Sequence, residues 1–73
     1  MKNTSECYID GKLISMQEIC SLQRDFAEAY IAENGLERRE GAKLWVQRFS
    51  KKCRELLEKG VKDRQDLERR LYQ

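Results

Sequence analysis

The 73-residue sequence contains no histidine, the side chain most often used for acid–base catalysis near neutral pH and a frequent zinc ligand. Catalysis would then depend on carboxylates, lysine, tyrosine or cysteine. The paired acidic residues, however, fall where helices are expected to face solvent or to be capped: Glu37/Glu40, Glu55/Glu58 and Asp63/Asp66. We therefore expect a protein that is not an enzyme.

Three scattered cysteines and four isolated glycines offer no metal or cofactor site. A zinc site normally needs four ligands, some of them closely spaced, and a phosphate-binding loop needs clustered glycines. Cys20 and Cys53 fall among apolar helical positions, so we expect both in the core. Cys7, on an expected hairpin, is the cysteine that we expect to be exposed. The sequence predicts no metal and no cofactor.

Long apolar runs are absent as well. No stretch approaches the ~18 apolar residues of a membrane-spanning helix, and no apolar leader segment follows the polar residues 1–6. We expect residues 1–6 to be frayed, and the protein to lie in the reducing cytoplasm without contacting a membrane.

A marked excess of one charge is also missing, since 15 basic residues nearly balance 13 acidic ones. A dedicated nucleic-acid-binding domain usually has a strong basic excess. Charged residues make up 38% of the chain and there is no proline, a combination that favours long, solvated helices.

Residues 7–14 predict a β-hairpin. The pair Asp10-Gly11 stands between two short apolar stretches, and Asp-Gly suits the positive φ angles of a tight type I′ turn. A ribbon of such short strands is marginal in water, so we expect it to pack on another part of the chain.

A helix is expected over residues 15–34. Ser15 can cap it by accepting a hydrogen bond from the backbone of Glu18, and Gly35 suits the left-handed position that ends a helix. Its apolar side chains recur at helical spacing on one side: Ile19, Cys20, Phe26, Ala27, Tyr30 and Ile31.

A second helix is expected over residues 37–59, and a third, capped by Asp63, over residues 63–72. At about 100° per residue, the apolar side chains of the second helix form one stripe. The stripe comprises Ala42, Trp45, Val46, Phe49, Cys53, Leu56 and Leu57.

These elements predict a single domain, residues 1–73, of mainly α class. A short N-terminal β-hairpin packs on an antiparallel pair of long helices, and a short C-terminal helix follows. A chain of this size has a thin stability margin and no disulfide or metal to reinforce it, which leaves a partner chain.

We therefore expect a small non-enzymatic protein-binding accessory or regulatory module. Its partner would be another protein or a second copy of the chain in a homodimer. Small, charge-rich helical chains of this kind are typical of bacterial or phage accessory proteins.

Four residues are candidates for a protein interface. Leu44 falls opposite the apolar stripe of the second helix, and Leu22 widens the stripe of the first, so each could face another chain. Trp45 is the single tryptophan and would be a natural hot-spot residue if it were partly exposed. Tyr8 lies on the hairpin, whose edges could accept a strand from a partner.

The alternative function is nucleic-acid binding through a basic surface on the second and third helices. A helix-turn-helix centred on Gly60 is not favoured, because Leu56 stands where a small residue is needed and the apolar residues that follow are out of register. A looser surface could still engage phosphates. Its candidates are Arg48, Lys51, Lys52, Arg54, Arg69 and Arg70.

Overall fold

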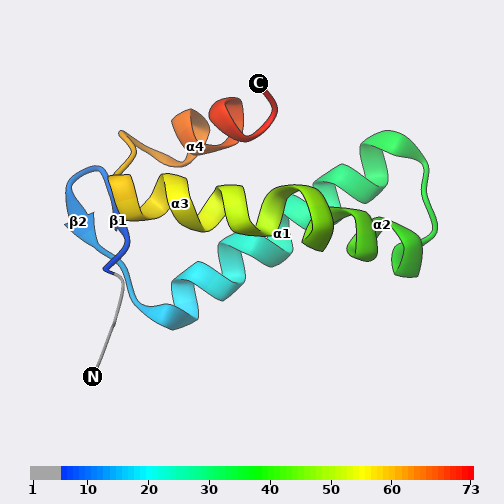
Figure 1. Cartoon of the computed structure of the whole chain (residues 1–73), viewed down its shortest axis with the longest axis horizontal. Helices are drawn as coiled ribbons and strands as arrows, with labels where there is room; N and C mark the ends of the chain where they lie inside the picture. The colour runs from blue at the N-terminus through cyan, green and yellow to red at the C-terminus, as the bar shows by residue number, and fades with distance from the viewer. Residues whose placement is uncertain (1–5) are drawn as a thin grey trace.

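The computed structural model describes residues 6–73 and contains a two-stranded sheet followed by helices (Figure 1). The bounds are β1 Tyr8–Ile9, β2 Lys12–Leu13, α1 Met16–Asn34, α2 Arg38–Trp45, η1 Val46–Ser50, α3 Lys51–Lys59 and α4 Arg64–Leu71. The α2, η1 and α3 segments follow one another without a break and form one long helix. The mainly α fold with an N-terminal hairpin is confirmed. Residues 1–6 were expected to be frayed, but residues 1–5 lie outside the part of the chain that the structure describes.

The hairpin turns as its sequence predicts. Asp10 and Gly11 have φ angles of 56° and 74°, and Tyr8 pairs with Leu13 across the antiparallel ribbon. On its other edge, β1 forms a parallel bridge with Val61, and the Asp10 backbone N–H donates to the Val61 carbonyl at 2.6 Å. This bridge explains how such a short ribbon is held, because it ties the hairpin to the segment that follows α3.

Both ends of α1 follow from local side-chain and backbone chemistry. The Ser15 hydroxyl accepts from the Glu18 backbone N–H at 3.2 Å. At the other end, Gly35 has a φ angle of 60°, and the Leu36 N–H donates to the Ile31 carbonyl at 3.2 Å. This left-handed cap satisfies carbonyl groups that the helix itself leaves unpaired.

The two long helices run in opposite directions and cross near the middle of the molecule (Figure 1). The α4 helix folds back over α3, and the hairpin covers the C-terminal end of α3. The core between them is built from buried side chains of all these parts: Cys7, Ile19, Leu22, Phe26, Trp45, Cys53, Leu57, Val61, Leu67 and Leu71. The other end of the molecule is thinner and is formed by α2 and the last turns of α1 (Figure 1).

Gly41 brings α1 and α2 into close contact. A Cβ atom at this position would overlap Cγ1 of Ile31 and lie 3.2 Å from its Cβ. The missing side chain therefore sets the distance between the two helices at the thin end of the molecule.

The cysteines are placed differently from the prediction. Cys7 is buried, whereas Cys20 is exposed; both expectations were wrong, and only Cys53 lies in the core as expected. The buried side of α1 passes through Ile19 and Leu22, and Cys20 is rotated by about 100° from Ile19 toward solvent. Cys7 is covered because its segment is held between the ribbon and the end of α3.

None of the helices in the described part of the chain is long and apolar enough to cross a bilayer.

Candidate functional site

The long second helix contains a π-helical turn, η1, at its centre. Its inward positions recur every four residues: Gly41, Trp45, Phe49, Cys53 and Leu57. In a regular α-helix of 3.6 residues per turn, a four-residue repeat would drift by about 40° at each step. A π-turn holds more residues per turn and takes up this excess. The turn therefore keeps one side of the whole helix on the core.

The outward side of the long helix carries a row of polar side chains. Arg39, Lys43, Gln47 and Lys51 also recur every four residues, and all four are exposed. Val46 lies on this outward side with 64% of its surface exposed. Val46 and Ala42 were expected on the inner stripe, and this prediction was wrong because the long helix does not keep an unbroken α-helical period.

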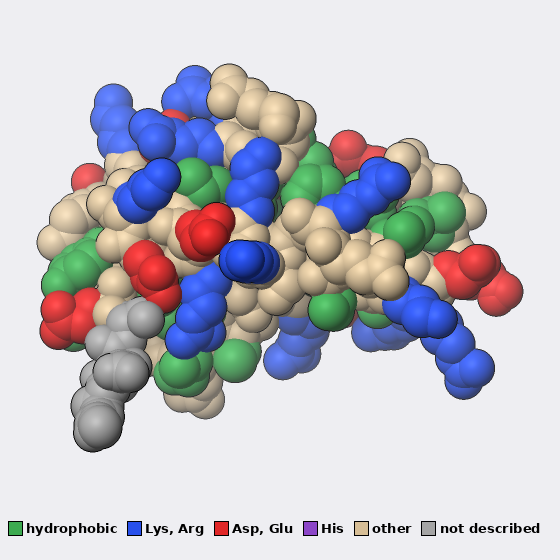
Figure 2. Space-filling model, viewed as in Figure 1, with side chains coloured by type: hydrophobic (Ala, Val, Ile, Leu, Met, Phe, Trp, Pro, Cys, Tyr) green, Lys and Arg blue, Asp and Glu red, His purple; other side chains and the backbone are tan. Residues whose placement is uncertain are grey.

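A shallow hollow lies on this outward side of α2 and η1. It has a volume of about 480 Å³ and is lined by Arg39, Ala42, Lys43, Val46 and Gln47. We call these five residues the Val46 surface. We call the small and apolar side chains of its lining, Ala42 and Val46, its floor, and the cationic ones, Arg39 and Lys43, its rim. In Figure 2, Lys and Arg side chains project around the end of the molecule that carries α2, with hydrophobic side chains between them.

The charge of the chain is divided between its two long helices. Residues 15–37 hold one basic and five acidic side chains, whereas residues 38–54 hold seven basic and one acidic. The near-neutral total therefore conceals a strongly basic segment.

Only some of these cations are neutralised within the chain. Arg38 pairs with Glu28 at 3.3 Å, and Arg54 pairs with Glu58 at 3.9 Å. Among residues 6–73, no ion pair involves the other exposed cations of the segment: Arg39, Lys43, Arg48 and Lys51. Two of these four, Arg39 and Lys43, line the Val46 surface.

The six nucleic-acid candidates divide into engaged and available side chains. Lys52 donates to the carbonyls of Leu71 and Gln73 at 3.3 and 3.1 Å, so it secures the end of α4 on α3. Arg54 pairs with Glu58, as described above, while Arg69 and Arg70 both contact one carboxylate on α4. Arg48 and Lys51 remain exposed on the long helix without an ion pair in the described part.

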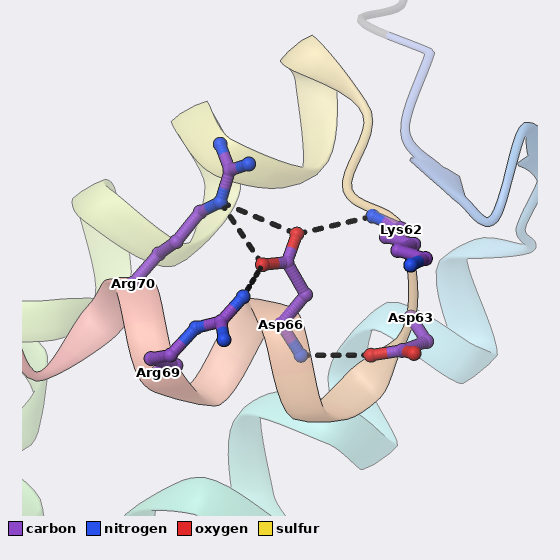
Figure 3. Close-up of polar contacts among 5 residues, drawn as sticks. All are labelled: Lys62, Asp63, Asp66, Arg69 and Arg70. Atoms are coloured by element: carbon purple, nitrogen blue, oxygen red, sulfur yellow. Dashed lines mark hydrogen bonds and ion pairs between the residues drawn. The ribbon is translucent and has the colours of Figure 1, made fainter.

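The carboxylate that binds these two arginines belongs to Asp66 (Figure 3). This side chain is 6% exposed and accepts from Arg69 at 2.6 Å, from Arg70 at 3.2 Å and from the Lys62 backbone N–H at 3.2 Å. Its own backbone N–H donates to the cap residue Asp63 at 2.8 Å. The Arg69 hydrogen bond, with those from Lys62 and Arg70, lowers the pKa of the Asp66 carboxyl despite its burial. The cluster fastens α4 to the loop before it and engages both oxygens of the Asp66 carboxylate.

The four protein-interface candidates differ in their exposure to solvent. Trp45 and Leu22 are 4% and 9% exposed, so both lie in the core. The Trp45 ring packs 5.2 Å from that of Phe49 between ring centres. Leu44 and Tyr8 are half-buried, and the Tyr8 hydroxyl donates to Glu6 at 2.9 Å.

The residues that shape the Val46 surface were not among the predicted site residues. The available signal was the four-residue spacing of Gly41, Trp45, Phe49 and Cys53, which is longer than an α-helical turn and requires a wider turn if all four face inward.

A second exposed apolar site lies where the hairpin meets α1. Leu13 and Met16 are both exposed there. The Ile14 backbone N–H donates to the Cys7 carbonyl across the ribbon. Since successive residues of a strand direct their backbone N–H and C=O groups to opposite sides, those of the preceding residue, Leu13, point to the outer side of β2. Among the described residues, that outer edge has no paired strand.

Two of the three cysteine thiols, those of Cys7 and Cys53, are buried. Burial raises the pKa of the Cys53 thiol to about 11 and also raises the pKa of Cys7, so neither is readily ionised. Within residues 6–73, no three Cys, Asp or Glu side chains are grouped so that they could hold a metal ion.

Comparison of the chain with protein-family models, with curated proteins and with solved structures gives no match.

Proposed function

We propose that this chain is a small non-enzymatic protein-binding accessory or regulatory module that contacts its partner through the Val46 surface. The observation that carries the proposal is the exposure of Val46 at the floor of an apolar hollow. Apolar floors with polar rims are typical of protein interfaces, in which the centre is desolvated and the rim stays wet.

The position of the hollow supports the proposal. The π-turn turns Val46 away from the core, although a valine on an unbroken helix would fall nearer the inner stripe. A π-turn is an energetically poor geometry that recurs at functional sites. The helix end that carries the hollow is also the thin end of the molecule, where a partner could approach without meeting α4 or the hairpin (Figure 1).

The partner in this proposal is a different chain. Two copies meeting symmetrically through the Val46 surface would bring Arg39 and Lys43 of each copy together, and juxtaposed like charges oppose association. The free thiols of Cys7 and Cys53 fit a reducing compartment such as the cytoplasm, where such a partner would be met.

Affinity capture with two matched variants tests the proposal. Val46→Glu and Met16→Glu each place a carboxylate at an exposed apolar position, one on the Val46 surface and one at the hairpin junction. We expect proteins retained by the wild-type chain and by Met16→Glu to be lost with Val46→Glu. Circular dichroism checks that both variants keep the helical content of the wild type.

Retention by Val46→Glu together with loss by Met16→Glu would place the interface at the hairpin and contradict the proposal. Equal retention by all three chains would contradict it as well.

Nucleic-acid binding is the second candidate, favoured by the four cations that have no ion pair within the described residues. An electrophoretic shift with duplex DNA and with single-stranded RNA, measured over a range of salt concentrations, tests it. Loss of the shift in an Arg48→Glu/Lys51→Glu variant would support this function, and the lack of any shift at low salt would contradict it.

A further inference from the structure

We infer that the Val46 surface receives an acidic amphipathic helix of the partner protein. This inference rests on the proposed function and specifies the chemistry of the partner.

The cations form a row along the exposed side of the long helix. Arg39, Lys43 and Lys51 span twelve residues of helix, which corresponds to about 18 Å at 1.5 Å per residue. A helix lying along this row would place carboxylates opposite it if Asp or Glu recurred every three or four residues. The row therefore suits a helix of at least three to four turns with one acidic side.

The apolar floor of the hollow favours an apolar side chain on the partner helix, placed between its carboxylates. Ala42 is small and lets a neighbouring helix approach closely, while Val46 offers an apolar contact. An aliphatic side chain on the partner would remove both from water, at roughly 25 cal/mol for each Å² of apolar surface buried. The partner side that fits is therefore mixed, with one apolar position flanked by acidic ones.

Nucleic acid fits this surface less well. Phosphate oxygens gain nothing from an apolar floor, and single-stranded binding normally relies on aromatic side chains that stack on bases. The aromatic residues of the long helix, Trp45 and Phe49, lie on its opposite, inward side. The Val46 surface offers charge without a platform for bases.

A second copy of this chain fits less well too. Its own acidic helix is α1, but two of the carboxylates on the outer side of α1 are already engaged. Asp25 pairs with Arg64 at 2.9 Å and Glu28 pairs with Arg38 at 3.3 Å. The basic row is therefore left without a sufficient acidic counterpart in the chain itself.

Selection from a peptide library tests the inference. Helical 18-residue peptides with one randomised side, displayed and selected against the intact chain, provide the probe. We expect enriched peptides to carry Asp or Glu at three- or four-residue spacing around one Leu, Ile, Met or Phe. A synthetic copy of the most enriched peptide is then labelled, and its affinity is measured by fluorescence anisotropy.

Charge reversals locate the bound peptide. Arg39→Glu and Lys43→Glu should each weaken binding about tenfold, because each removes one attraction and adds one repulsion. Arg24→Glu, the same change on an exposed position of α1, serves as the control and should alter affinity less than about twofold.

Salt and competition distinguish the rival ligands. Binding should weaken only moderately between about 50 and 500 mM NaCl, because part of it is apolar, and duplex DNA should not displace the peptide. Displacement by DNA, with affinity falling steeply with salt, would overturn the inference in favour of nucleic acid.

Two further results separate this inference from the proposed function. Enriched peptides that lack acidic residues but lose affinity with Val46→Glu would overturn the inference and leave the proposed function standing. Peptides unaffected by Val46→Glu, together with captured proteins unaffected by it, would overturn both.

Discussion

Replacing Gly41 by alanine tests how closely α1 and α2 approach each other. In an unconstrained helix the change would stabilise the protein by about 1 kcal/mol, because alanine is the better helix former. Here the added methyl group would overlap Cγ1 of Ile31 and lie 3.0 Å from its Cδ1 and 3.2 Å from its Cβ. The Ile31 Cβ cannot move by a simple rotamer change, so the backbones must separate.

Overpacking of this kind costs about 1–3 kcal/mol. After the gain of about 1 kcal/mol in helix propensity is subtracted, the net expectation is a loss of up to about 2 kcal/mol in the free energy of unfolding, equivalent to a fall in Tm of up to roughly 15 °C for a domain of this size. Urea denaturation followed by circular dichroism measures the loss. The change should become stabilising, by about 1 kcal/mol, in an Ile31→Ala background, where only the helix propensity remains. A Gly41→Ala chain that is more stable than the wild type would refute the close approach of the two helices.

Three shorter predictions concern a helix cap, a buried carboxylate and the thiols. Gly35→Ala should lower stability by about 1 kcal/mol in the same urea assay, because the φ angle of 60° disfavours a side chain, and Ile31→Ala should not rescue it. Asp66→Asn should lower Tm at neutral pH, and the deficit should shrink as the pH falls. The carboxylate stabilises the fold above its unfolded pKa near 3.8, and this stabilisation is lost as the pH falls through the lower folded value; a deficit that is constant with pH would contradict it. Iodoacetamide should modify Cys20 in the native chain but modify Cys53 and Cys7 only after unfolding, as mass spectrometry of timed samples can show.

The turns and helix ends were predictable because each depends on a few neighbouring residues. Asp10-Gly11 reverses the chain with positive φ angles, Ser15 caps α1 and Gly35 ends it, as their local patterns indicate. Asp63 caps α4 in the same way. Such features need no knowledge of what the segment packs against.

The outward side of the second helix could not be read in the same way. A uniform helical period assigns Val46 to the core, whereas the π-turn shifts every later residue and leaves it exposed. The decision depends on tertiary packing, since Phe49 and Cys53 can reach the core only if the helix widens before them. The prediction for the cysteines was wrong for a related reason. Leu22 occupies the inward position on α1, so Cys20 faces solvent.

The burial of Asp66 could not be predicted from the sequence either. An acidic residue in the first turn of a helix is normally solvated, and Asp66 was expected to face solvent or to take part in capping the helix. The structure folds Arg69 and Arg70 back over the carboxylate, which removes the same two arginines from the basic surface expected for nucleic acid. Helical spacing allows these contacts but does not distinguish them from solvated side chains.

Protection of position 46 by a bound partner tests the central claim most directly. A Val46→Cys chain carries a reactive thiol on the Val46 surface, while the native Cys20, exposed on α1, serves as an internal reference. Iodoacetamide labelling is followed with and without the captured protein or the selected peptide. The account predicts that binding slows modification at position 46 and leaves Cys20 unchanged. Unchanged labelling at position 46 in the saturated complex would contradict it.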